Sequence, residues 1–157
     1  MPIIRGSLAI LALSVVAACS STPKSIVDLD AADKRFEAPR PGLGAVYIVR
    51  EGYWTSSPVA VLVDRRRIDT LAYDNYLRVE LPPGQHDIRA QSIDTGNHLA
   101  VTNVQVAAGE IRFVALSNAV FDGLFARSIT ELSARELSSG DGRAAVLSRT
   151  RAAPGAL

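Results

Sequence analysis

Few residues of this chain are of the types that catalyse reactions or bind metals. The sequence has two histidines, His86 and His98, and one cysteine, Cys19, in 157 residues. A zinc site needs about four such ligands at close spacing, so we expect no bound metal. No serine lies in a Gly-x-Ser-x-Gly motif, and no glycine-rich phosphate loop is present. We therefore predict a protein that is not an enzyme and has no cofactor, with His86 as a surface residue on a strand.

One acidic motif has a possible catalytic interpretation. Asp94-Thr95-Gly96 has the core sequence of an aspartic-peptidase site, in which two carboxylates share one proton. A single copy supplies one carboxylate, so this chemistry requires a homodimer. Asn97 stands where those enzymes usually have a small residue, and Asp-Thr-Gly also favours a turn between two strands. The turn is the favoured interpretation, and a dimeric aspartic peptidase built on Asp94 is the remote alternative.

The cysteine lies at the end of an apolar leader. Arg5 is the only charge before it, and Leu8 to Val16 forms an apolar stretch typical of a signal peptide and too short to span a bilayer. The sequence Val-Ala-Ala-Cys that ends at Cys19 resembles the bacterial lipobox. That resemblance implies cleavage between Ala18 and Cys19, with diacylglyceryl and N-acyl lipid on Cys19. Ser20 follows in place of aspartate, which implies the periplasmic face of the outer membrane. A plain secretory signal or a retained helical anchor are the alternatives.

Composition restricts the partners of the mature chain. The chain is 48% hydrophobic, which is enough for a globular core. It has 17 basic and 16 acidic residues, and removal of residues 1–18 takes away Arg5 alone among them, so the mature charge is zero. Nucleic-acid binding depends on an excess of positive charge that neutralises phosphates. We therefore expect no nucleic-acid partner.

The sequence divides into four segments. Residues 1–18 are the predicted signal peptide, and residues 19–44 are a predicted flexible tether with room for a short helix over Val27–Phe36. From residue 45 to residue 150 apolar side chains alternate with polar ones, and we predict an all-β fold, a small antiparallel sandwich of about seven or eight short strands. Residues 151–157 are a predicted frayed tail. The expected strands are Val46–Arg50, Val59–Asp64, Arg67–Leu71, Tyr76–Leu81, His86–Gln91, Val101–Val106 and Ile111–Leu116.

The connections carry their own predictions. Asp64-Arg65-Arg66 predicts a tight turn, although the turn type stays open. Pro83 and Gly84 suit a type II turn, which makes Val79–Ile88 a predicted hairpin. Residues 117–128 are expected to form a loop with apolar content, and Ile129–Leu137 suits either a strand or a helix. A short C-terminal helix is expected over Gly142–Arg149, capped by Asp141.

The order of these pieces resembles a known family. A first strand like Ala45–Arg50, a hairpin around Asp64, the Pro-Pro-Gly-x-His turn that ends at His86, and the Ala-Gly-Glu turn that ends at Glu110 are similar to bacterial lipoproteins with the domain of unknown function 2846. They are also similar to the β-sandwich modules named after a Pro-Glu-Gly-Ala motif. The resemblance covers Gly44 to about Leu137. The family brings no established catalytic residues.

Three surface candidates follow from residue type. Tyr53 and Trp54 are suited to stacking on sugar rings, or to packing at one end of the sandwich. Arg65-Arg66-Arg67 is suited to lipid phosphates, or forms a solvated turn that protects a sheet edge. The apolar side chains of Phe121, Leu124 and Phe125 either cover the core or contact a partner protein.

These expectations favour a lipid-anchored envelope module that binds another envelope protein and has no catalytic activity. The alternative is a module that binds glycan, such as peptidoglycan, through Tyr53 and Trp54. The membrane is the expected partner of the lipid on Cys19.

Overall fold

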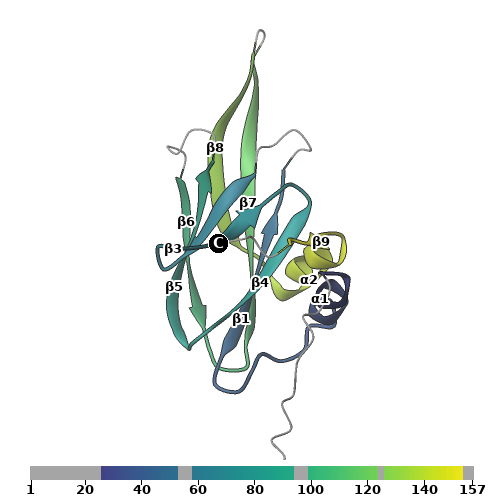
Figure 1. Cartoon of the computed structure of the whole chain (residues 1–157). Helices are drawn as coiled ribbons and strands as arrows, with labels where there is room; N and C mark the ends of the chain where they lie inside the picture. The colour runs from purple at the N-terminus through teal and green to yellow at the C-terminus, as the bar shows by residue number, and fades with distance from the viewer. Residues whose placement is uncertain (1–25, 53–57, 94–98, 124–125, 154–157) are drawn as a thin grey trace, which may run out of the picture.

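The computed structural model describes residues 26–52, 58–93, 99–123 and 126–153, and it describes the backbone alone for residues 119–123 and 126–131. No helix within these ranges has the length and apolar composition needed to cross a membrane. Figure 1 shows strands in two layers with two helices beside them. In chain order the elements are α1 (Ile26–Asp33), β1 (Gly44–Arg50), β2 (Val59–Val63), β3 (Arg66–Leu71), β4 (Asn75–Leu81), β5 (Gly84–Ser92), β6 (Leu99–Val106), β7 (Ile111–Gly123), β8 (Ala126–Glu136), α2 (Ser139–Leu147) and β9 (Thr150–Arg151).

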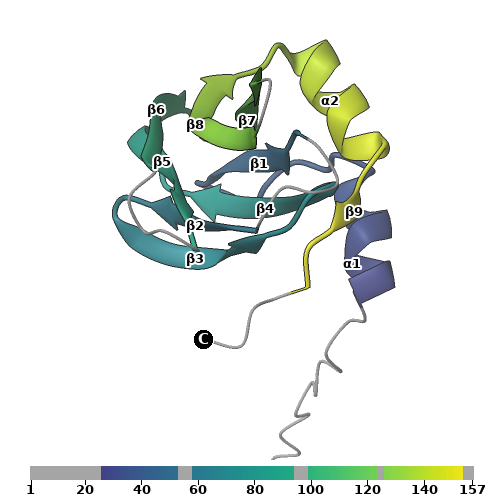
Figure 2. The same cartoon turned by 90° about the horizontal axis from the view of Figure 1, so that it is seen from above.

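The strands form two stacked sheets, seen from above in Figure 2. One sheet has the strand order β8-β7-β1-β4-β9, and the other has the order β3-β2-β5-β6. Among the described strands, β1 runs parallel to β7 and β4 runs parallel to β9, while the other pairs are antiparallel. The predicted small β-sandwich with a short C-terminal helix is confirmed.

Both faces of β1 are buried, which explains its continuous apolar sequence. Val46 and Ile48 face the second sheet and lie in the core between the two layers. Tyr47 and Val49 face the opposite way and pack with Phe113 in a second cluster on the helix side. A strand that is covered on both faces needs apolar side chains at successive positions instead of alternating ones.

The helix α2 begins at Ser139, earlier in the chain than predicted, and its N-cap is Ser138 instead of Asp141. The Oγ of Ser138 accepts a hydrogen bond from the backbone N–H of Asp141 at 3.2 Å and donates one to Asp141 Oδ2 at 2.7 Å. This reciprocal arrangement satisfies a backbone donor that the first helical turn would otherwise leave unpaired. The predicted cap, Asp141, is therefore the partner of the actual cap.

Part of the predicted tether belongs to the folded domain. The Tyr47 hydroxyl donates a hydrogen bond of 2.7 Å to the backbone oxygen of Asp33, the last residue of α1. Phe36 follows the helix, and its ring centroid lies 5.4 Å from that of Tyr47 and 6.1 Å from that of Phe113. The prediction of a flexible tether over residues 19–44 is therefore wrong for residues 26–43, because α1 and Phe36 pack on the outer face of the five-stranded sheet.

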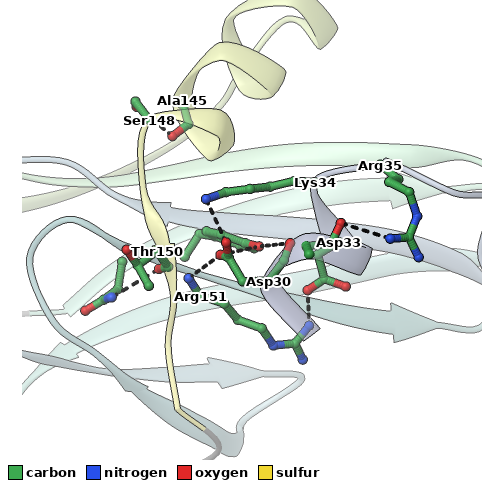
Figure 3. Close-up of polar contacts among 11 residues, drawn as sticks. Asp30, Asp33, Lys34, Arg35, Ala145, Ser148, Thr150 and Arg151 are labelled. Atoms are coloured by element: carbon green, nitrogen blue, oxygen red, sulfur yellow. Dashed lines mark hydrogen bonds and ion pairs between the residues drawn. The ribbon is translucent and has the colours of Figure 1, made fainter. Parts of the chain in front are cut away.

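The predicted frayed tail is also partly ordered. β9 extends the five-stranded sheet beside β4, and the N–H of Ala152 donates to the Tyr76 carbonyl at 2.7 Å. The N–H of Arg151 donates to Asp30 Oδ1 at 2.8 Å, and its guanidinium pairs with Asp33. Figure 3 shows these contacts between α1 and β9. They join the first and last described elements, so the boundary predicted at residue 151 is wrong for residues 151–152.

The Pro-Pro-Gly sequence does not form a hairpin turn. β4 and β5, which precede and follow Pro82 and Pro83, belong to different sheets, so the chain crosses here from one layer to the other. Gly84 has φ of +148°, far from the value of about +80° at the glycine of a type II turn. Proline has no N–H to give to a strand ladder, which suits a segment that leaves one sheet before it enters the next.

The β2–β3 connection is a two-residue turn in which Asp64 and Arg65 have φ of +49° and +65°. Positive φ at both central residues is the property of a type I′ turn, whose twist matches that of two antiparallel strands. Val63 and Arg66 form the closing pair. The predicted tight turn is confirmed and its type is now defined.

Candidate functional site

Several predicted site residues lie outside the described residues. The backbone course of Phe121 lies in β7, but its side chain is outside the described part of the chain. The predicted lipidation, cleavage, glycan and peptidase residues therefore remain predictions. Those outside the described ranges are Ala18, Cys19, Tyr53, Trp54, Asp94, His98, Leu124 and Phe125.

The most prominent surface feature is the β7–β8 hairpin. β1 ends at Arg50, which is level with Leu116 of β7, while β7 and β8 stay paired as far as Gly123 and Ala126. Residues 117–123 at about 3.3 Å each carry the hairpin about 23 Å beyond the end of β1. Figure 1 shows it projecting from one end of the sandwich. The loop expected over residues 117–128 is therefore wrong, and the strand alternative for residues 129–136 is confirmed.

The backbone of this hairpin is suited to pairing with another chain. Past Leu116, no described strand lies beside β7 on its β1 side. A two-stranded ribbon is only marginally stable alone, and an unpaired edge offers backbone N–H and C=O groups to an added strand. The projecting part of the hairpin therefore gains stability when a partner covers it.

The basic turn points away from the projecting hairpin. β1 runs toward the hairpin, so Leu81 of the antiparallel β4 lies beside Gly44 at the other end. β2 runs from Val59, paired with Ser92, to Val63, paired with Ile88 in the middle of β5, so the turn that follows Val63 points away from the hairpin and lies part-way along the sandwich. The basic side chains there, Arg65, Arg66 and Arg67, are all exposed.

His86 is buried, so the prediction of a surface histidine is wrong. Its Nδ1 lies 2.7 Å from Asp64 Oδ2, and its Nε2 lies 2.8 Å from the Pro82 carbonyl oxygen. A carboxylate and a carbonyl only accept hydrogen bonds, so both ring nitrogens donate when the ring carries a proton on each. Burial lowers the pKa of His86, but the hydrogen bonds to Asp64 and Pro82 outweigh it, and the pKa is raised above its usual value of 6.5. The sequence feature that could have indicated a buried histidine is Asp64, because the β2–β3 turn places its carboxylate beside the imidazole.

A polar groove of about 550 Å³ lies between α1, residues 37–41 and β4. Its lining includes Tyr47, Arg78 and Glu80, and Arg78 lies 5.8 Å from the centre of the Tyr47 ring. Glu80 pairs with Arg78 at 2.8 Å and with Arg40 at 2.5 Å. Burial raises the pKa of Glu80, but hydrogen bonds from Arg40 and Arg78 outweigh it and the pKa is lowered. The charges on this side chain are thus satisfied within the protein, and they position residues 37–41 against the sheet.

Neither a metal site nor a similarity to known proteins assigns a function to these residues. Within the described ranges, no group of three or more histidine, cysteine, aspartate or glutamate residues is placed to hold a metal ion. The chain matches no protein-family model, no curated protein and no solved structure. The functional argument therefore depends on the residues themselves.

Proposed function

We propose that this protein is a lipid-anchored module of the bacterial cell envelope that binds another envelope protein and catalyses no reaction. The observation that carries the binding part is the β7–β8 hairpin, which extends beyond β1 with an unpaired edge. The sequence of its turn region, Phe121 to Phe125, is apolar enough to add side-chain contacts to backbone pairing.

The anchoring part of the proposal depends on the lipobox-like sequence that ends at Cys19. A single acyl chain binds a membrane only marginally, whereas two or three chains on one residue anchor a protein stably. Residues 20–25 separate that cysteine from the start of α1 at Ile26. Six residues reach at most about 20 Å, so the domain would stay close to the lipid surface.

The basic turn gives this module a preferred orientation. Each arginine near an anionic membrane surface contributes about 1 kcal/mol. Arg65, Arg66 and Arg67 are exposed at a turn that points away from the hairpin. When this turn faces the headgroups, the hairpin points away from the membrane toward a partner in the periplasm.

Site-specific crosslinking in cells tests the binding surface. A photoreactive amino acid at Phe121 should give one dominant crosslinked protein, because this position lies in the projecting hairpin. The same amino acid at Gln105, an exposed position on β6 near the opposite end, is the matched control. Identical crosslinks from both positions, or none from Phe121, would refute the hairpin as the interface.

Two further measurements separate the parts of the proposal. Cys19→Ser should release the protein from membranes, and a variant that still sediments with membranes after an alkaline wash would contradict the lipid anchor. Retention on peptidoglycan that is reduced by Trp54→Ala would favour the glycan alternative over the protein partner.

A further inference from the structure

Arg50, the last residue of β1, carries a fully buried guanidinium. Val46 and Ile48 of β1 face the layer between the sheets, and Arg50 has the same parity, so its side chain leaves the strand on that inner face. Burial lowers the pKa of Arg50 to about 10. No ion pair to Arg50 is present in the described part of the chain. A buried charge without a counter-ion is costly, so a ligand that supplied one would stabilise it.

The hydrogen bonds of this guanidinium leave one of its edges free. Its Nη1 donates to the carbonyl oxygens of Glu51 at 2.9 Å and Leu116 at 3.2 Å. Its Nε and Nη2 are buried and have no hydrogen-bond partner among the residues that the structure describes. These two nitrogens form one edge of the planar group, where their N–H bonds run parallel and match two oxygens of one carboxylate or phosphate. The carbonyl oxygens of Glu51 and Leu116 hold the guanidinium in one orientation before any ligand binds.

A second unpaired polar atom lies in the same layer. The Oδ1 of Asn118 is buried and has no hydrogen-bond partner within the described ranges. Leu116 lies beside Arg50 and belongs to the core between the sheets, and Asn118 is two residues further along β7 on the same face. An amide oxygen accepts hydrogen bonds, so it complements an O–H or N–H on the ligand.

We propose that Arg50 binds an oxyanion, a carboxylate or phosphate, at the hairpin end of the sandwich. Nε and Nη2 of Arg50 donate to two of its oxygens, and Asn118 accepts from a hydroxyl on the phosphate or on the atom next to the carboxylate. We expect the ligand to enter at the end of β1, because Gly52, two residues past Arg50, is exposed. This inference is independent of the lipid anchor and of the hairpin as an interface.

The test follows the Arg50 Nε–H signal by ¹H–¹⁵N NMR in the purified chain. The signal is assigned by its loss in Arg50→Lys, which keeps the charge but has no fork. Sodium phosphate, glycolate and acetate are added separately, with sodium chloride keeping the ionic strength constant. We expect a saturable shift with phosphate or glycolate and weaker binding of acetate, which has no hydroxyl. A response to phosphate alone identifies a phosphate ligand, and a response to glycolate alone identifies a hydroxy-carboxylate.

Variants separate specific binding from general ionic effects. Binding of the anion should raise the unfolding temperature of the wild type. Arg50→Lys should weaken the affinity for the anion, measured by this thermal shift, by about tenfold or more, since hydrogen bonds to charged groups contribute about 1.5 to 3 kcal/mol. Arg35→Lys, at an exposed arginine just after α1, should leave it unchanged. If Arg50→Lys does not fold, Arg50→Met replaces it, because an apolar side chain of similar length removes the buried charge. An Arg50 signal that none of the three anions moves, or equal losses in Arg50→Lys and Arg35→Lys, overturns the proposal.

Discussion

Replacing His86 with glutamine should weaken the fold, and the loss should depend on pH. The imidazole connects the β2–β3 turn, through Asp64, to the β4–β5 crossing, through Pro82. Protonated histidine donates to both acceptors, whereas the glutamine amide replaces one nitrogen donor and carries no charge. The variant therefore loses one hydrogen bond and the attraction between the imidazolium and Asp64.

The size of the loss follows from these contacts. A hydrogen bond to a charged group contributes about 1.5 to 3 kcal/mol. The Asp64 side chain is 49% exposed, so solvent screens its charge and the expected loss falls to about 1 to 2 kcal/mol. The folded-state pKa of His86 is raised above 6.5, so its contribution is complete below the unfolded-state pKa. The contribution disappears as the pH rises through the folded-state pKa, because neutral histidine, like glutamine, cannot donate to both acceptors.

Urea denaturation of wild type and His86→Gln from about pH 6 to about pH 9 measures this difference. The difference in unfolding free energy should be largest at the acidic end and should shrink toward the alkaline end. Asp64→Asn should show the same trend with pH, since it removes the charge that raises the pKa. A difference that stays constant, or that grows with rising pH, would refute the assignment of a doubly donating histidine.

Two further predictions concern backbone positions. Gly142→Ala should destabilise the protein by about 1 to 3 kcal/mol, because the added Cβ would lie 2.1 Å from Phe113 Cγ. Gly140→Ala is the matched control, because its added Cβ meets no atom closer than 4.0 Å, and it should be neutral or slightly stabilising in thermal unfolding. Arg65→Gly should stabilise the protein by about 1 kcal/mol, since Arg65 has φ of +65° in a type I′ turn, a conformation that is unfavourable for a residue with a Cβ. Arg66→Gly, at the first residue of β3, should not stabilise it. A lower urea midpoint for Arg65→Gly would contradict backbone strain at Arg65.

The sandwich was predictable because its strands alternate, whereas the attachment of α1 and β9 to it was not, because their contacts are polar. Ile88 and Ala90 are buried while Arg89 between them is partly exposed, and that period of two is visible in the sequence. The helix α1, with the sequence IVDLDAAD, has no clear apolar face. It is held instead by carboxylates, of which Asp30 reaches Arg151 across 121 positions. Local sequence patterns contain no record of such distant pairings.

The same distinction applies to the candidate sites. The basic turn was visible as three consecutive arginines, and their exposure follows from their charge. The burial of Arg50 was not visible in the sequence, since an arginine at the end of a strand normally reaches solvent. Its burial results from the meeting of β1 and β7, whose pairing places the carbonyl of Leu116 at its Nη1. β1 and β7 are far apart in the sequence, so their parallel pairing becomes visible only in the folded sheet.

The attachment of α1 to the sheet changes how a lipid anchor would act on the domain. A flexible segment of 25 residues would allow about 25 to 30 Å of free movement. The Tyr47 hydroxyl, Asp30 and Asp33 instead fix α1 to β1 and β9, so the spacer is reduced to residues 20–25. A spacer of that length keeps the domain within about 20 Å of the surface and restricts the orientations it can adopt. With so short a spacer, the projecting hairpin would set how far from the membrane the domain can contact a partner. It extends about 23 Å beyond β1 on the side away from the basic turn.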